Sequence, residues 1–209
     1  MGELVFDCVD ARAERYAAAP TLTLVLQVAE TTGLAVSAIA LRCQIRIQPQ
    51  RRRYDPVEAE RLRDLFGEPE RWGDTLKPLQ FATVPAMVPA FRNTVQVELA
   101  VPCTYDLEVA STRYLDALDG GDVPLLLLFS GTVFAQGGTG LTVEQVPWHK
   151  ECAYRLPAQV WREVMDAHFP DSAWLRLSRA TVEALGRFKS DRALPTWEDT
   201  VRTLLGEAR

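Results

Sequence analysis

The chain of 209 residues has a hydrophobic content of 47% and a charged content of 24%, which lie within the range of folded globular proteins. Its formal net charge of -5 excludes a general polyanion binder, because affinity for phosphate backbones comes from many cations that neutralise charge together. The longest apolar run, Val123 to Phe129, is far shorter than the roughly 20 residues that a membrane-spanning helix needs.

Two strands are predicted near the start of the chain. In the segment from Leu22 to Val28, every second residue is leucine or valine, which indicates one apolar face. From Ile39 to Gln48 apolar and polar residues alternate strictly, so one face of this strand is expected in the core and the other in solvent. Arg42 and Arg46 fall on the solvent face.

A helix is predicted from Asp55 to Phe66. Asp55 can cap its first turn, Pro56 suits the first helical position, and Glu58 completes an Asp-x-x-Glu capping box. Gly67 supplies the residue that commonly ends a helix. The apolar side of this helix is formed by Val57, Leu62, Leu65 and Phe66.

The following segment is predicted to be irregular before a long strand begins. Residues 71–91 contain three prolines and are expected to form a connection with one short strand near 79–84. Residues 95–109 alternate between apolar and polar side chains and predict a single strand, in which Pro102 marks an edge, a bulge or a bend. Residues 111–121 are expected to form a short helix that ends at two glycines.

A central strand is predicted over residues 123–135. Both of its faces are apolar, a pattern typical of a strand that is covered on both sides, and Gly131 is a candidate for a bulge. A glycine-rich loop, residues 136–140, is then expected to make a hairpin with a strand over 141–148.

The end of the chain changes from strand to helix periodicity. Ser178 and Thr196 can cap two of three predicted helices, which cover residues 157–168, 178–189 and 196–205. A run of strands followed by a run of helices indicates the α+β class, with an antiparallel β-sandwich-like body and C-terminal helices packed at one side. We expect a body over 1–156, with the helix at 55–66 inserted, and a helical tail over 157–209, together in one structural domain.

Four cysteines lie far apart in the sequence without a C-x-x-C pair: Cys8, Cys43, Cys103 and Cys152. Reduced and mostly buried thiols in a cytoplasmic protein are the simplest interpretation, and two disulfides remain the alternative. Cys43 and Cys103 fall on the predicted core faces, where a thiol is a poor nucleophile.

No metal, cofactor or catalytic group is predicted. His149 and Cys152 are three residues apart, and such positions on a strand face opposite ways. Ser130 lies inside a strand rather than in a nucleophile elbow, and His168 is not placed by sequence to serve it. The glycine-rich loop leads into a strand, whereas a phosphate-binding loop leads into a helix.

The most basic segment of the chain extends from Arg42 to Trp72. Its eight arginines face six acidic residues, so the segment sums to +2 while the other residues sum to -7. Arg61 and Arg63 have acidic neighbours on the same predicted helix, which favours local ion pairs over a phosphate-binding stripe. If the two long strands were neighbours, Arg42 and Arg46 could pair with Glu98, Asp106 and Glu108. No nucleic-acid partner is expected.

An epitope for a protein partner is the preferred interpretation of the remaining arginines. Arginine and tyrosine are the residues that tend to dominate protein–protein hot spots. The alternative is an ordinary solvated loop. The candidate partner-binding residues are Arg42, Arg46, Arg51, Arg52, Arg53 and Tyr54.

A second hypothesis is a small-molecule or lipid-binding module with a pocket between the sheet and the helices. The aromatic residues that would line this pocket are Phe134, Trp148, Trp161 and Trp174. An enzyme with an unrecognised active site and a chaperone for unfolded segments are the remaining alternatives.

The sequence also resembles an uncharacterised actinobacterial family, DUF6084-like, over residues 21–205. The segments that carry the resemblance are LRCQIRIQPQRRRYD, LRDLFGEPERWGDTL, VPCTYDLEVA, DGGDVPLLLLFSGTVF, QVPWHKECAYRLP and SAWLRL. The resemblance implies an accessory or assembly role beside an uptake [NiFe] hydrogenase, with a hydrogenase subunit or maturation factor as partner, and it supplies no catalytic residues. We therefore expect a non-enzymatic cytoplasmic protein that acts by binding another protein.

Overall fold

The computed structural model describes residues 3–103, 109–137, 140–170 and 177–207, and it confirms an α+β fold with a sandwich-like body. The chain divides into two compact units, Met1–Pro170 and Asp171–Arg209. The first unit contains all the described strands and the helices through α5, and the second contains α6 and α7. None of the helices in the described residues is long and apolar enough to cross a membrane.

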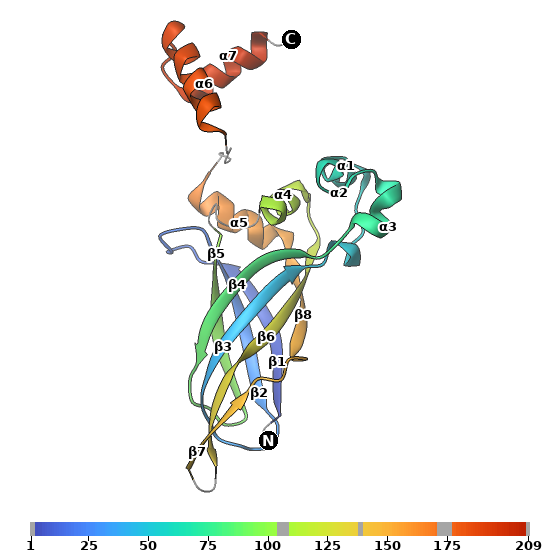
Figure 1. The fold of residues 1–209 in the computed structure, drawn as a ribbon, viewed down its shortest axis with the longest axis vertical. Helices are drawn as coiled ribbons and strands as arrows, with labels where there is room; N and C mark the ends of the chain where they lie inside the picture. Colours follow the sequence, from blue (N-terminus) through green and yellow to red (C-terminus); the bar gives the residue numbers. More distant parts are fainter. Residues whose placement is uncertain (1–2, 104–108, 138–139, 171–176, 208–209) are drawn as a thin grey trace. The chain divides into compact units, whose positions relative to one another are not determined.

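One sheet of the first unit has three antiparallel strands in the order β1-β2-β5 (Figure 1). The strands are β1 (Leu4–Ala13), β2 (Thr21–Glu30) and β5 (Thr94–Pro102). β5 lies at the edge of this sheet and ends at Pro102, which confirms the expected edge position of that proline.

The other sheet has five antiparallel strands arranged around β3 and β6. They are β3 (Val36–Ile47), β4 (Leu79–Val88), β6 (Asp122–Gly137), β7 (Gly140–Gln145) and β8 (Glu151–Pro157). β6 pairs with β8 along its first half and with β7 along its second half.

Gly131 lies where the partner of β6 changes from β8 to β7, and the carbonyl of Gly131 accepts a 2.9 Å hydrogen bond from Val146. Its φ is +149°, and a Cβ at this position would lie 2.1 Å from the carbonyl oxygen of Ala40 on β3. The register with β3 continues through Gly131, so the predicted bulge is wrong there and the glycine instead permits a close approach of two backbones.

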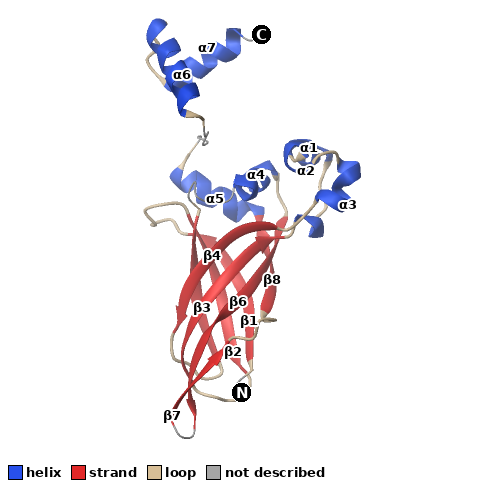
Figure 2. Ribbon diagram, viewed as in Figure 1, coloured by secondary structure: helices blue, strands red, loops and turns tan. Residues whose placement is uncertain are grey.

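The helices of the first unit lie at one end of the sandwich (Figure 2). They comprise η1 (Pro49–Arg51), α1 (Pro56–Arg61), α2 (Arg63–Phe66), η2 (Pro69–Arg71), α3 (Trp72–Thr75), α4 (Val109–Ala117) and α5 (Ala158–His168). α5 packs against β1 and β2, and its Trp161 is buried with the indole N–H donating to Asp116 at 3.0 Å. The second unit consists of α6 (Arg179–Asp191) and α7 (Trp197–Glu207).

The hydrophobic core of the first unit lies between the inner faces of the two sheets. Leu22, Leu24 and Leu26 of β2 and Ile39 and Ile45 of β3 are fully buried. Phe6 of β1 stacks on Phe129 of β6 with ring centroids 4.4 Å apart, so aromatic rings join the sheets directly. Burial of Cys43 and Cys103 in this core confirms their predicted faces.

Several predicted elements are confirmed, and others need correction. The strands at 22–28 and 39–48 and the three late helices are present with slightly different ends. The short strand expected near 79–84 is wrong in length, because β4 continues through Pro85 to Val88. An edge strand tolerates a proline there since one side of its backbone has no neighbour.

The predicted strand over residues 95–109 is also wrong in extent. β5 ends at Pro102, α4 begins at Val109, and residues 104–108 lie outside the described part of the chain. Two further strands, β1 and β8, were not among the predicted elements, although Cys152, Tyr154 and Leu156 of β8 alternate with more exposed residues.

The expectation that residues 123–135 are covered on both faces is wrong. The inner side chains of β6, such as Leu125 and Leu127, are buried between the sheets. The outer side chains Leu126, Leu128 and Phe134 remain partly exposed, and the helices gather at the end of the sandwich instead of along this face (Figure 2). The five-stranded sheet therefore has an uncovered outer face with apolar residues on it.

Candidate docking surface

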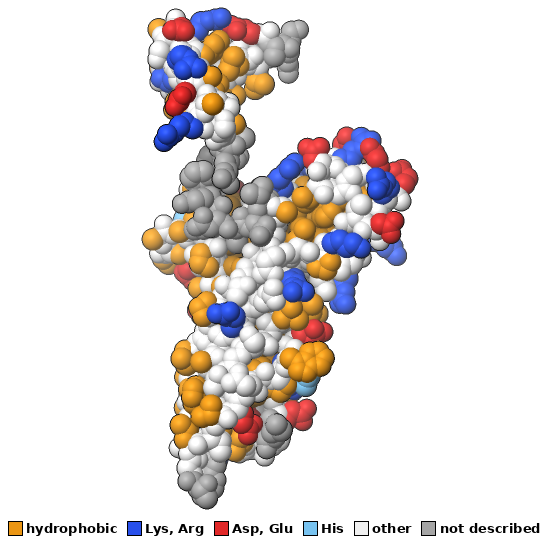
Figure 3. Space-filling model, viewed as in Figure 1, with side chains coloured by type: hydrophobic (Ala, Val, Ile, Leu, Met, Phe, Trp, Pro, Cys, Tyr) orange, Lys and Arg blue, Asp and Glu red, His pale blue; other side chains and the backbone are white. Residues whose placement is uncertain are grey.

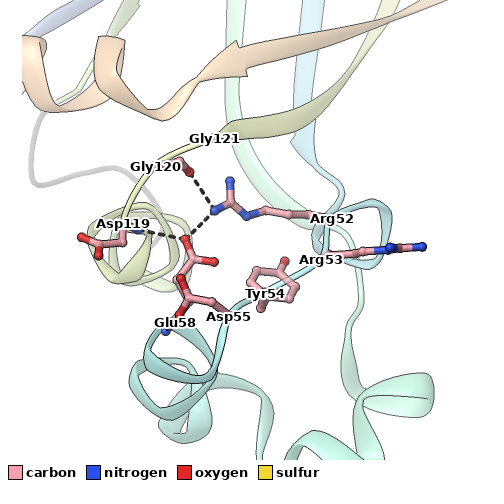
Figure 4. A pocket seen from close by; sticks show the side chains of 8 residues that line it. All are labelled: Arg52, Arg53, Tyr54, Asp55, Glu58, Asp119, Gly120 and Gly121. Carbon is pink, nitrogen blue, oxygen red and sulfur yellow. Dashed lines mark hydrogen bonds and ion pairs between the residues drawn. The ribbon is translucent and has the colours of Figure 1, made fainter.

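Arg52 does not point into solvent, although the sequence placed it in an exposed loop. Its Nη2 forms an ion pair with Glu58 and donates to the carbonyl of Gly120 at 2.7 Å, while Nη1 donates to the carbonyl of Asp122 at 2.8 Å. Only 9% of the Arg52 side chain and 5% of the Glu58 side chain are exposed. Arg52 therefore links the start of α1 to the loop between α4 and β6 through hydrogen bonds and an ion pair, as Figure 4 shows.

Glu58 also departs from its predicted role. The cap itself is confirmed, because the carboxylate of Asp55 accepts hydrogen bonds from the backbone N–H groups of Val57 and Glu58 at 2.8 and 2.9 Å. The Glu58 carboxylate, however, accepts from Arg52 and from the backbone N–H of Asp119 instead of completing a capping box. A buried arginine nearby offers a charged donor, which binds a carboxylate more strongly than a neutral N–H does.

Tyr54 is likewise part of the packing. Its hydroxyl donates to the carbonyl of Pro49 at 2.8 Å and lies 2.8 Å from the hydroxyl of Tyr114. Its ring makes edge contacts with Trp72 and Tyr114, whose centroids are 5.2 and 6.3 Å away. Burial raises the pKa of Tyr54 above its ordinary value and raises that of Tyr114 to about 12. Both tyrosines are thus neutral structural residues.

Beside this cluster lies an open depression of about 510 Å³. Its lining is polar and comprises Arg52, Arg53, Tyr54, Asp55, Glu58, Asp119, Gly120 and Gly121. The Nε of Arg52 is buried and has no hydrogen-bond partner in the described part of the chain. Buried donors are normally paired, so this N–H is an exception in the packing around Arg52.

The four consecutive candidate residues Arg51, Arg52, Arg53 and Tyr54, here called the corner, therefore divide into structural and free residues. Arg51 and Arg53 are exposed, and within the described residues neither forms an ion pair. The Arg53 side chain extends away from the guanidinium of Arg52 (Figure 4). Two of the four corner residues remain available to a partner.

The helices beside this corner carry charges that are largely neutralised locally. Basic and acidic side chains are interspersed over α1–α3 (Figure 3). Arg63 pairs with Glu60 at 3.1 Å and with Glu68 at 2.7 Å, which confirms the local ion pairs predicted for it, and Arg61 lies 3.8 Å from Asp119. This part of the surface lacks the continuous basic stripe that binds phosphates.

Arg42 and Arg46 lie together on the outer face of the five-stranded sheet. They are four residues apart on β3, where Arg42 is opposite Ser130 and Arg46 is opposite Leu126 of β6. Arg42 is exposed and Arg46 makes one side-chain contact, to Gln44 at 3.4 Å. The predicted pairing with Glu98 is wrong, because β3 and β5 belong to different sheets and Glu98 of β5 pairs with Arg12 of β1. Asp106 and Glu108 lie outside the described residues.

Neighbouring strands add one more arginine and several apolar side chains to this face. Arg155 of β8 is exposed opposite Pro124, and Glu151 of β8 lies opposite Leu128. Within the described ranges, none of the three arginines takes part in an ion pair. The apolar residues of the face are Met87, Leu126, Leu128, Phe134, Leu141 and Val143.

The aromatic residues expected to line a pocket do not share one cavity. Trp148 is 89% exposed in a turn, Trp161 is buried against Phe81, and Phe134 lies on the outer face of β6. Trp174 falls outside the described residues. Neither the depression beside Arg52 nor a smaller cavity of about 60 Å³ near Glu30 is lined by any of the three described side chains.

The histidines and thiols lie on separate elements. His149 is exposed in the turn before β8, and His168 at the end of α5 contacts the carbonyls of Val164 and Ala17 at 3.2 and 3.0 Å. All four cysteines are free thiols. Within the described residues, no group of three or more histidine, cysteine, aspartate or glutamate side chains could hold a metal ion.

The fold and this surface define a class of protein: an α+β sandwich with an uncovered, arginine-bearing sheet face. The chain belongs to a family of unknown function, DUF6084, whose model matches residues 1–209. No curated protein matches the chain.

Two solved structures are among those that the chain resembles in part. A β-glucosidase from Kluyveromyces marxianus has a TM-score of 0.29 and 7% identity, with 74% of this chain and 15% of that chain covered. β-Glucosidase 3B from Thermotoga neapolitana has a TM-score of 0.26 and 10% identity, with 74% and 17% covered. The chain thus spans less than a fifth of the length of either enzyme.

Proposed function

We propose that this protein is a non-enzymatic accessory or assembly protein that binds another protein through the outer face of its five-stranded sheet. The observation that carries the proposal is the combination, on this face, of Arg42, Arg46 and Arg155 without ion pairs and of the partly exposed leucines of β6. A chain that places leucines on an uncovered sheet face leaves apolar surface that a partner can cover.

The charge of the face indicates the chemistry of the partner. Three arginines and one glutamate leave the face basic in a chain whose net charge is -5. Arginine binds carboxylates through two parallel N–H donors, and it is enriched in protein–protein hot spots. The partner surface is therefore one on which acidic side chains surround an apolar centre.

The resemblance noted above suggests where to look for this partner. A subunit of an uptake [NiFe] hydrogenase, or one of its maturation factors, is the first candidate, in the cytoplasm. Catalysis by the protein itself is not part of the proposal, because the described thiols are mostly buried and the two histidines lie on different elements.

The test is affinity capture of the tagged full-length protein from its native host, followed by mass spectrometry. A double variant, Arg42→Glu with Arg46→Glu, is expected to lose a partner that the wild type captures reproducibly, since reversed charges would repel an acidic surface. Arg12→Glu on the three-stranded sheet is the matched control and should retain the partner. Capture of no reproducible partner, or its full retention by the double variant, would reject the proposal.

The corner residues are tested separately. A variant with Arg51→Glu and Arg53→Glu leaves the Arg52–Glu58 ion pair intact while it reverses the two free charges. If this variant alone loses the partner, the docking surface is the corner and not the sheet face.

A small-molecule module is the second candidate function, and the depression beside Arg52 favours it. Its polar lining suits a small polar ligand rather than a lipid. Native mass spectrometry of the purified protein distinguishes the two: a bound ligand of constant mass favours this candidate, and its absence favours the first.

A further inference from the structure

The second compact unit exposes an apolar stripe that its own two helices do not cover. Trp197, Val201 and Leu205 of α7 are spaced by four residues, so they lie on one face of the helix, and they are 51%, 40% and 63% exposed. Val182 of α6 is 45% exposed as well. Figure 3 shows hydrophobic side chains gathered on this unit with charged side chains around them.

This unit has almost no core of its own. Among its described residues only Thr200 is fully buried, and its hydroxyl donates to the carbonyl of Thr196. The helices meet where a Cβ added to Gly186 would lie 3.8 Å from the ring of Trp197, and where Arg192 pairs with Glu207. Helices of 13 and 11 residues are marginal by themselves, and units of under about 40 residues usually need further support such as oligomerisation.

The charges of the two helices are opposite. α6 with its C-terminal Arg192 carries four basic and two acidic residues, a sum of +2. α7 carries one basic and three acidic residues, a sum of -2. The unit as a whole is therefore neutral over its helices, and a second copy would not be repelled. A two-fold axis would bring α6 of each copy against α7 of the other.

We propose that α6 and α7 form a dimerisation element, in which two copies of this chain cover each other's apolar stripes. Packing of Val201, Leu205 and the exposed half of Trp197 against α6 of the second copy removes this apolar area from water. The opposite charges of α6 and α7 select this crossed pairing over a pairing of like helices. The inference is independent of the partner proposed for the sheet face.

The first test measures the mass of the full chain by sedimentation equilibrium over a range of concentrations. The wild type is expected to approach twice the monomer mass of 23.4 kDa as its concentration rises. A variant with Val201→Lys and Leu205→Lys should have a dimer dissociation constant at least about tenfold higher, because charges would enter the apolar contact. Val57→Lys, an exposed valine on α1, is the matched control and should dimerise like the wild type.

Circular dichroism of the double variant shows whether α6 and α7 still form when the stripe is charged. A monomeric wild type at all concentrations would overturn the proposal. A dimer that the double variant leaves unchanged would overturn it too, since the contact would then lie elsewhere.

A charge-reversal pair tests the crossed arrangement. Arg187→Glu in α6 and Glu198→Arg in α7 should each weaken the homodimer, because each brings the summed charge of the changed helix to zero and so removes its attraction for the opposite helix of the other copy. A mixture of the two single variants should form heterodimers in preference to either homodimer, as measured by native mass spectrometry. Random mixing would overturn the pairing of α6 with α7 of the other copy.

Discussion

Arg52 and Glu58 form an ion pair in which both side chains are more than nine-tenths buried, and it joins the arginine segment to the first turn of α1. The same guanidinium holds the carbonyls of Gly120 and Asp122, so one side chain joins the start of α1 to the loop before β6.

Replacement of Arg52 by alanine is expected to lower the free energy of unfolding by about 3–5 kcal/mol, because it leaves the carboxylate of Glu58 buried without its counter-charge. Urea denaturation measures the effect. Arg53→Ala, at the neighbouring exposed arginine, should change the stability by less than about 0.5 kcal/mol. Equal effects of the two substitutions would contradict a structural role for Arg52.

Gly131→Ala is expected to destabilise the protein by about 3 kcal/mol, since a Cβ would meet the Ala40 carbonyl oxygen at 2.1 Å and the residue has a positive φ. Thermal and urea unfolding provide the measurement. Gly73→Ala is the control, because a Cβ there meets no atom within 4 Å. A mild effect at Gly131 would mean that β3 and β6 approach less closely than described.

Glu30 predicts a dependence of stability on acid pH. Burial alone would raise the pKa of its carboxyl, but hydrogen bonds from Thr32, Leu34 and Glu3 outweigh burial and hold the pKa below its ordinary value of 4.5. The stabilisation is present above that ordinary pKa and is lost as the pH falls through the lowered pKa of the folded state.

Glu30→Gln should therefore reduce the free energy of unfolding at neutral pH. Below about pH 4.5 the free energy of unfolding of this variant should fall less steeply with decreasing pH than that of the wild type. Urea denaturation across this range gives both quantities. Glu163→Gln, on the exposed side of α5, should keep the wild-type pH profile. The same acid slope in both variants would show that Glu30 does not carry the effect.

The thiols are expected to be unreactive in the folded protein. Burial raises the pKa of Cys8 and of Cys103 to about 12 and that of Cys152 to about 11, and it also raises the pKa of Cys43. At neutral pH a disulfide reagent should react slowly with the native protein. After denaturation it should react rapidly with all four thiols. Cys8→Ser should remove the fastest of the slow phases, because Cys8 is the least buried thiol. A thiol that reacts at once in the native state would contradict this.

Local periodicity is enough to predict the strands that have one buried face and one face in solvent. β3 alternates strictly because it has one buried and one solvent-facing side, and Arg42 and Arg46 were placed on the correct side. The caps of α1 and α6 were correct as well, since Asp55 and Ser178 bond to backbone N–H groups only two or three residues away. The alternation in β1 changes phase at the register shift between Cys8 and Asp10, so its sequence carries no continuous period of two.

The sequence by itself determined the class of fold, the faces of the clearest strands and the basic character of the segment around Arg42–Tyr54, because each depends on residues close together in the chain. The tertiary structure alone decided which arginines are free. Arg52 and Arg53 are adjacent and chemically identical, yet only Arg52 meets Glu58, Gly120 and Asp122, two of which lie 68 or more residues away in the chain. Such long-range partners are set by how the sheets and loops pack, and no local pattern encodes them.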